Sequence, residues 1–304
     1  MTSVSQAPTH IVLLNCRAGS LSAELEPGIR ARFEAHGITP DIRIMERGDD
    51  VVATAKQAIE RKPRVIVAGG GDGTLNAVAG ALLGSGITLG VLPLGTLNHF
   101  AKDLGIPLEL EGAIDTICEG RAVSVDVGNV NGRVFLNNSS LGLYPLVVRR
   151  RDQLIQRLGH PKWPAFFWAA MLVLRRYPFL DVRLTVDGKS LPYRTPLLFV
   201  GNNEYVLDGL VLGARKRLDA GCLSVHIVRR VDRLGLAALA IRALFRGLRK
   251  AADFETFCAT ELQVQTRRSS VNVATDGEVT RMESPLLYKT EAGRLSVMAA
   301  MDQD

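Results

Sequence analysis

The fold is decided by residues 65–76, which read VIVAGGGDGTLN. A run of β-branched and apolar residues stops at three consecutive glycines, and a helix-compatible segment, residues 75–83, follows. A strand–loop–helix of this kind presents backbone N–H groups to an anion, and glycines let a phosphate approach the backbone. Asp72 lies within the loop, where a carboxylate beside a phosphate site indicates a divalent cation. The alternative is a tight strand-to-helix turn that binds no ligand.

This loop matches neither of the two commonest phosphate-binding motifs. No Lys-Ser or Lys-Thr pair follows it at Walker spacing, and Asn76 occupies the place of the last glycine of a dinucleotide-binding loop. The triplet Gly188-Lys189-Ser190 also fails as a Walker motif, because Arg183 stands where the first glycine is required. We expect a hairpin turn at residues 187–188 instead.

The decapeptide GGGDGTLNAV resembles the GGDGT loop of diacylglycerol kinases, sphingosine and ceramide kinases and bacterial lipid kinases. NAD kinases and 6-phosphofructokinases have related loops. The chain is most similar to the bacterial diacylglycerol kinase-like group, and the resemblance extends through most of its length.

Length and composition predict a globular protein of about two domains. The chain has 304 residues, of which 47% are hydrophobic and 22% are charged. The pI of about 9.3 and the formal net charge of +6 favour an anionic partner such as a nucleotide or an acidic lipid surface. Binding to nucleic acid has only this net charge in its favour, so we expect none.

The cysteines and the termini favour a reduced cytosolic location. The four cysteines form no CxxC pair, which predicts neither a zinc site nor a disulfide framework: Cys16, Cys118, Cys222 and Cys258. Residues 1–10 contain no apolar signal core. Residues 73–101 contain no Asp, Glu, Lys or Arg, but glycines and a proline interrupt them, so we interpret them as the buried centre of a parallel sheet.

The first part of the chain alternates strands with helices. Strands are expected at residues 10–14, 41–45, 65–68 and 88–92, and helices at residues 22–36 and 49–61. This alternation predicts a doubly wound parallel sheet, in which ligands bind beyond the carboxyl ends of the strands. Three loops would therefore converge at one edge: residues 15–20, 69–74 and 95–98.

All three loops resemble nucleotide-binding loops of the family. The first resembles NPxxG with Cys16 in place of the proline, the third resembles PxGTxND with His99 in place of the acidic residue, and Ile44 replaces a nucleotide-contacting threonine. The resemblance implies that these loops bind ATP through Asn15, Arg17, Gly69, Gly70, Gly71, Asp72, Gly73, Thr74, Gly95, Thr96 and Asn98.

After residue 123 the pattern becomes β-rich. Strands are expected at residues 124–130, 133–139, 180–186, 195–201, 223–229, 261–266 and 271–275. Asp126 begins a stretch that resembles the family's DxGxxNGxxFxNxxSxG, and through that similarity we expect the last strands to return to the first domain. The expected architecture is an α/β two-domain chain: a doubly wound nucleotide-binding domain (residues 1–123 and 285–304) and a β-sandwich-like lipid-binding domain (residues 124–284).

Two segments of helical periodicity interrupt the second domain. Residues 146–177 contain Arg149, Arg150 and Arg151 followed by Trp and Phe residues, and residues 229–250 combine an apolar face with a basic face. Such segments can lie in the interface of a bilayer, although an ordinary core helix with a basic outer side is the alternative. Neither is long enough to span a membrane. We therefore expect peripheral binding to an anionic membrane.

Asp276-Gly277-Glu278 resembles the DGE motif of the family, whose glutamate acts as base on the acceptor hydroxyl. The resemblance implies that Glu278, Asp72 and Asp276 form the catalytic set and that ATP and Mg²⁺ are the cofactors, with Asp72 acting on the metal through Mg-ATP. Ala220 stands where the family often has an aspartate that binds a structural Mg²⁺, which argues against a second metal here.

These observations predict an ATP-dependent lipid kinase that phosphorylates a hydroxyl of diacylglycerol or a related lipid, cytoplasmic and peripherally membrane-associated. One alternative is a soluble kinase of the NAD kinase type. Another is a non-catalytic regulator that binds nucleotide or lipid, which the replacements Ile44, His99 and Ala220 would favour. The sequence fixes neither the identity of the lipid nor the oligomeric state, although a homodimer is compatible with it.

Overall fold

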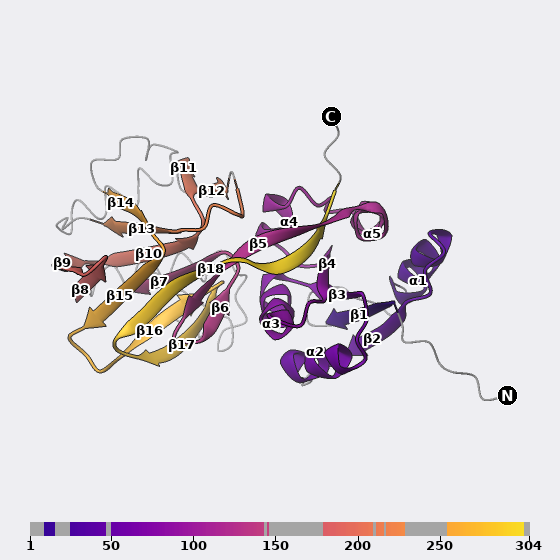
Figure 1. Ribbon diagram of the computed structural model, residues 1–304, viewed down its shortest axis with the longest axis horizontal. Coiled ribbons are helices and arrows are strands. Elements are labelled where there is room, and N and C mark those ends of the chain that lie inside the picture. Colours follow the sequence, from indigo (N-terminus) through magenta and orange to yellow (C-terminus); the bar gives the residue numbers. More distant parts are fainter. Residues whose placement is uncertain are drawn as a thin grey trace, which may run out of the picture. The chain divides into compact units, whose positions relative to one another are not determined.

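The computed structural model describes residues 9–15, 25–46, 50–142, 145, 179–208, 211–215, 217–228 and 254–300 (Figure 1). The chain forms two compact units, Met1–Val127 with Ala292–Asp304, and Gly128–Glu291. Two strands contain the boundaries, because β5 (Arg121–Val130) and β18 (Leu286–Ala299) each include residues of both units.

The first unit is built on parallel strands in the order β2-β1-β3-β4-β18. Their bounds are β1 His10–Asn15, β2 Asp41–Met45, β3 Val65–Gly70 and β4 Thr88–Pro93. Every residue of β1 and β3 is buried, as expected of strands covered on both faces. The doubly wound α/β domain predicted from the sequence is therefore confirmed.

Among the residues that the structure describes in this unit, five helices cover the sheet: α1 Leu25–Ala35, α2 Val51–Glu60, α3 Asp72–Leu82, α4 His99–Asp103 and α5 Leu110–Glu119. Helices α1 and α5 pack together, α2 and α3 pack together, and the two pairs cover opposite faces of the sheet (Figure 1). Helix α2 begins where the Asp50 carboxylate accepts hydrogen bonds from the N–H groups of Val52 and Ala53, at 2.9 and 3.3 Å.

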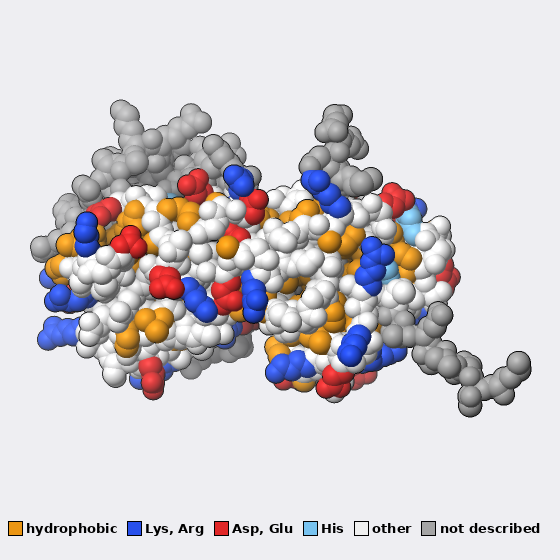
Figure 2. Space-filling view, viewed as in Figure 1, with side chains coloured by type: hydrophobic (Ala, Val, Ile, Leu, Met, Phe, Trp, Pro, Cys, Tyr) orange, Lys and Arg blue, Asp and Glu red, His pale blue; other side chains and the backbone are white. Residues whose placement is uncertain are grey.

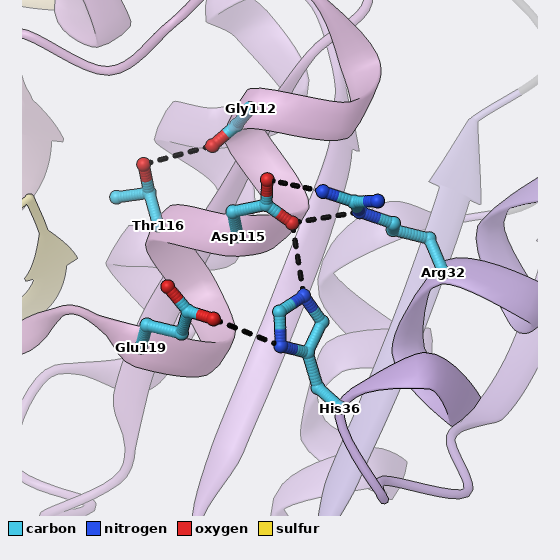
Figure 3. A network of polar contacts seen from close by, with 6 residues as sticks. All are labelled: Arg32, His36, Gly112, Asp115, Thr116 and Glu119. Carbon is cyan, nitrogen blue, oxygen red and sulfur yellow. Dashed lines mark hydrogen bonds and ion pairs between the residues drawn. The ribbon is translucent and has the colours of Figure 1, made fainter.

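A polar network joins α1 to α5 at the surface of this unit (Figure 3). Arg32 donates to both carboxylate oxygens of Asp115, at 2.7 and 2.5 Å. His36 contacts Asp115 at 2.9 Å with one ring nitrogen and Glu119 at 3.2 Å with the other. The bonds from Arg32, followed by the bond from His36, lower the pKa of Asp115 to about 2.

The second unit is β-rich, as the sequence predicts. One sheet has the order β14-β13-β10-β7-β16-β17. Further strands pair as β18-β15-β8-β9, with β5 paired to β18 and β6 paired to β5. Apolar side chains from both sets form a buried core that includes Leu141, Val200, Val225, Val264 and Tyr288. The strand bounds are β6 Arg133–Phe135, β7 Asn138–Gly142, β8 Leu180–Val186, β9 Lys189–Thr195, β10 Leu197–Asn202, β11 Tyr205–Asp208, β12 Val211–Arg215, β13 Leu223–Val228, β14 Phe254–Ala259, β15 Glu261–Thr266, β16 Ser270–Thr275 and β17 Glu278–Glu283.

The hairpin turn predicted at Asp187-Gly188 is confirmed, and Asn131-Gly132 forms a second turn of the same kind. Both residues of each pair have positive φ, 48° and 84° in the first and 49° and 74° in the second. This is the conformation of a two-residue type I′ turn, for which Asn-Gly and Asp-Gly are preferred. The second turn joins β8 to β9, so Gly188-Lys189 does not belong to a phosphate loop.

The single strand expected at residues 133–139 is wrong, because the structure has two strands there, β6 and β7. Leu136 and Asn137 lie between the two strands, and Asn138 begins β7. The N–H groups of all three donate to the carboxylate of Asp276. Since these donors bind a side chain, residues 136–137 do not continue the strand.

The expectation that the cysteines form no disulfide is wrong for one pair. Cys222 and Cys258 are joined, with their Cα atoms 5.9 Å apart. Cys222 immediately precedes β13, and Cys258 lies on β14 opposite Ser224, so the antiparallel ladder brings the two together. Their sequence separation of 36 residues has no diagnostic spacing. Cys118 is a free thiol, and burial raises its pKa to about 11.

The two basic segments expected at the membrane, residues 146–177 and 229–250, lie outside the described residues. Within the described part of the chain, no helix has the length and apolar character needed to cross a membrane. On the face drawn in Figure 2, the basic side chains of described residues are interspersed with acidic ones.

Candidate functional site

The glycine loop leads directly from a buried strand into a helix. Strand β3 ends at Gly70, Gly71 is the N-cap residue, and α3 begins at Asp72, earlier than the helix expected from residue 75. The N-cap has no side chain that could satisfy the first backbone N–H groups of the helix. The loop therefore provides the backbone donors and the positive end of a helix dipole that bind anions.

The first two glycines of the loop are required by packing as well. A Cβ atom on Gly69 would lie 2.5 Å from Cδ2 of Leu14, and one on Gly70 would lie 2.6 Å from Cβ of Thr74. Either substitution would force neighbouring side chains to move.

A second loop, residues 94–98, packs against the glycine loop. The N–H of Leu94 donates to the carbonyl of Gly70 at 3.0 Å. A Cβ atom on Gly95 would lie only 2.5 Å from the Cα of Gly71. The two loops thus meet backbone to backbone, and glycine is needed at position 95, whereas a Cβ on Gly71 would lie 3.5 Å from the Cα of Gly95, an ordinary contact distance.

Asp72 links the glycine loop to helix α4. Its Oδ1 accepts a hydrogen bond from the N–H of Phe100 at 3.3 Å, and the residue is half-buried. The carboxylate lies on the first residue of α3, at the helix end whose N-cap makes no side-chain hydrogen bond. Carboxylate oxygens are ligands that Mg²⁺ prefers, so Asp72 fits a role beside a metal–phosphate complex.

Asn98 shapes the second loop. It has a left-handed backbone conformation with φ 50°, and its Oδ1 accepts from the N–H of Gly95 at 3.0 Å. Its Nδ2 donates to the carbonyls of Pro93 and Gly95, at 3.1 and 3.0 Å. The buried amide of Asn98 is thus bound within its own loop, whereas Thr96 is exposed.

The other residues expected at the nucleotide site differ in their surroundings. Asn15, at the end of β1, donates from Nδ2 to Oγ1 of Thr74 at 2.9 Å, and both residues are buried. Asn15 therefore fixes the threonine that packs over the glycine loop. Ile44 is exposed at the end of β2 and His99 is exposed at the start of α4, whereas Arg17 lies outside the described residues.

In the second unit, Asp276 and Gly277 form the turn between β16 and β17. Their φ angles of 47° and 83° match a type I′ turn. The Asp276 carboxylate accepts three backbone N–H bonds at 2.8 to 2.9 Å, from Leu136, Asn137 and Asn138. Burial raises the pKa of Asp276 to about 6, while the three donors act in the opposite direction.

Glu278 follows this turn with 63% of its side chain exposed. Arg133, which the sequence analysis missed, holds it in place. The Nη2 of Arg133 donates to Glu278 at 2.7 Å, and its Nε donates to the hydroxyl of buried Thr275 at 2.8 Å. The pair is separated by 145 residues, so no local motif points to it. The arrangement leaves a carboxylate that is oriented yet accessible.

Ala220 lies in the loop between β12 and β13. Its N–H donates to Oδ1 of Asn203 at 2.8 Å, and the neighbouring Asp219 is paired with Arg217 at 2.9 Å. The bonds from Arg217 lower the pKa of Asp219. The carboxylate of Asp219 therefore forms an ion pair with Arg217.

Comparison with protein families assigns both halves of the chain. Residues 9–130 match the model of the diacylglycerol kinase catalytic domain, and residues 142–299 match that of the YegS C-terminal NAD kinase beta sandwich-like domain. The two matches agree with the α/β unit and the β-rich unit described above.

Individual relatives agree with this assignment. A diacylglycerol kinase from Staphylococcus carnosus is 26% identical over 224 residues, 73% of this chain and 72% of that protein. One from Staphylococcus aureus strain JH9 is 29% identical over 206 residues, 67% of this chain and 65% of that protein. The crystal structure of a diacylglycerol kinase from Bacillus anthracis shares the fold, with a TM-score of 0.71 at 20% identity over 96% of both chains. The chain thus belongs to the bacterial diacylglycerol kinase-like lipid kinase family.

Proposed function

We propose that this protein is an ATP- and Mg²⁺-dependent lipid kinase that transfers the γ-phosphoryl group to a hydroxyl of diacylglycerol or a related lipid. The observation that supports this most directly is the glycine loop, which places a helix N-terminus without a side-chain cap and the carboxylate of Asp72 together at the start of α3. Phosphoryl transfer depends mainly on positioning and on electrostatic stabilisation of the phosphates.

Within the first unit, the loop at residues 69–74 would bind the phosphates, and the loop at residues 94–98 would hold it in position by packing against its backbone. Asp72 would hold Mg²⁺, which supplies charge neutralisation for the phosphates when bound. The bond from Phe100 to one carboxylate oxygen orients the side chain for this role. Asn15 and Asn98 would act through the loops they fix rather than by direct contact.

Within the second unit, Glu278 would act as general base on the acceptor hydroxyl. A base must be exposed to its substrate and held in one orientation, and Arg133 provides that orientation. Asp276 has its carboxylate bound to three N–H groups, so we assign it to fixing the turn that presents Glu278 rather than to proton transfer. This assignment replaces the catalytic role expected for Asp276 from the family motif.

The lipid substrate implies work at a membrane surface, and we propose a cytoplasmic protein that binds anionic membranes peripherally. The support is the net charge of +6 and the basic, aromatic composition of residues 146–177. Binding to vesicles of phosphatidylglycerol should then weaken as salt rises, because electrostatic attraction is screened over about 10 Å at 0.1 M.

The proposal is tested by incubating the purified protein with γ-labelled ATP, Mg²⁺, NAD and a mixed bacterial lipid extract, and identifying the labelled product. We expect label in one class of lipid that bears a free hydroxyl. Binding of Mg-ATP without transfer to any lipid would instead support the non-catalytic regulator, and label on NAD would support the soluble kinase.

A further inference from the structure

The segment at residues 136–138 is held from two sides by buried polar groups. On one side its three N–H groups donate to Asp276. The amide of Asp276 returns a bond to the carbonyl of Asn138 at 2.9 Å. The position of the turn that leads to Glu278 therefore depends on the position of this segment.

On the other side the segment is bound by Arg215, the last residue of β12. The Nη1 of Arg215 donates to the carbonyl of Leu136 at 2.6 Å and to that of Asn202 at 3.3 Å. Its Nη2 donates to Oδ1 of Asn137 at 2.9 Å. The planar guanidinium thus fixes one backbone group and one side chain of the segment at once, which a point charge cannot do equally well.

Arg215 is only 5% exposed, although it is a charged residue. A buried charge is costly unless hydrogen bonds and an opposite charge compensate it. The carbonyls supply the hydrogen bonds, and the positive charge of Arg215 is the smallest of the effects that oppose the rise in the pKa of Asp276 caused by its burial. The aromatic ring of Tyr205, 5.6 Å from the guanidinium carbon, adds a further favourable contact. Arg215 and Asp276 therefore both bind the segment at residues 136–138.

We propose that Arg215 is a positioning residue for Glu278. It binds Leu136 and Asn137. Residues 136–138 in turn bind the Asp276 carboxylate, and the Asp276-Gly277 turn sets the direction of Glu278 at the start of β17. The inference rests on the proposed function, in which Glu278 is the base. A base displaced by about 1 Å can lose about 10²-fold in rate, so a residue that touches no substrate can control turnover in this way.

The test compares Arg215→Met and Arg215→Lys with Arg217→Met. Arg217 is the matched control, because it lies two positions further on, is exposed, and pairs with Asp219 at the surface. We expect Arg215→Met to lower kcat by about 10²-fold while KM for ATP changes less than about threefold, since the nucleotide loops belong to the other unit. Arg215→Lys should retain about tenfold more activity than Arg215→Met, and Arg217→Met should match the wild type.

A second measurement does not depend on catalysis. Hydrogen exchange of the amides of Leu136, Asn137 and Asn138 should become at least about tenfold faster in Arg215→Met and remain unchanged in Arg217→Met. If Arg215→Met does not fold, Arg215→Lys decides, because a wild-type kcat and wild-type exchange in that variant would overturn the proposal.

Unchanged exchange in Arg215→Met, or a loss of kcat matched by an equal rise in KM for ATP, would overturn it as well. A wild-type protein that phosphorylates no lipid would refute the proposed function, whereas the exchange measurement would still decide whether Arg215 holds the segment.

Discussion

Replacing Gly95 with alanine is the sharpest test of the nucleotide site. The new Cβ would lie 2.5 Å from the Cα of Gly71 and 2.7 Å from Oδ1 of Asn98. Ordinary carbon–carbon contact is about 3.5 to 4.0 Å, so the new Cβ would overlap the Cα of Gly71 by about 1 Å. A backbone atom cannot relieve such an overlap by rotating a side chain. Overpacking of this kind costs about 1 to 3 kcal/mol. The easiest relief is to move the second loop away from the glycine loop.

If the loops separate, the glycine loop loses its support, and we expect a cost of this size in the free energy of Mg-ATP binding. At about 1.4 kcal/mol per factor of ten, Mg-ATP affinity should fall by about 10- to 100-fold. Isothermal titration with Mg-ATP measures this below the first unfolding transition. Gly28→Ala is the control, because no atom lies within 4 Å of the added Cβ in helix α1; it should bind Mg-ATP as the wild type does. Wild-type affinity in Gly95→Ala would refute the reasoning that the two loops form one site.

Three further predictions concern stability. Burial lowers the pKa of His226 to about 4, below its unfolded value of 6.5, so the unfolded state binds more protons in this range. The stabilising contribution of neutral His226 should therefore be fully present above pH 6.5, and the free energy of unfolding should fall by about 3 kcal/mol as the pH drops to about 4. Calorimetry should show a smaller fall for His226→Phe, and an equal fall would contradict the assignment. The lowered pKa of Asp115 stabilises the fold above about pH 4, and this contribution is lost as the pH falls toward 2; Asp115→Asn should cost under about 1 kcal/mol in urea unfolding at pH 7, because the network is partly exposed, with turnover unchanged. Finally, a chelator should leave the melting temperature of the nucleotide-free protein unchanged, because Ala220 supplies no carboxylate and Asp219 is bound to Arg217; a lower melting temperature would reveal a structural metal.

The sequence is informative where a local pattern determines the structure. The apolar strands of the first unit, the glycine loop and the Asn-Gly and Asp-Gly turns follow from periodicity and from the backbone freedom of glycine. Glu278, which the family motif singled out, directly follows such a turn in the structure. Each of these features depends on residues that are close together in the chain.

The features that the sequence analysis missed depend on distant residues. Arg133 meets Glu278 across 145 residues, and Arg215 meets Leu136 across 79. The Cys222–Cys258 disulfide depends on the pairing of β13 with β14. The break between β6 and β7 likewise requires the carboxylate of Asp276, 140 residues away from Leu136. No spacing rule encodes these contacts, because tertiary packing alone creates them.

The central claim is that Glu278 acts on the acceptor and that the glycine loop with Asp72 acts on Mg-ATP. The direct measurement is phosphoryl transfer from γ-labelled ATP to the identified lipid by the wild type, Glu278→Gln and Asp72→Asn, with Mg-ATP binding measured in parallel. We predict that Glu278→Gln binds Mg-ATP normally but labels no lipid, and that Asp72→Asn loses about 10²-fold or more in turnover. Wild-type transfer by Glu278→Gln, or loss of Mg-ATP binding in that variant, would contradict the account.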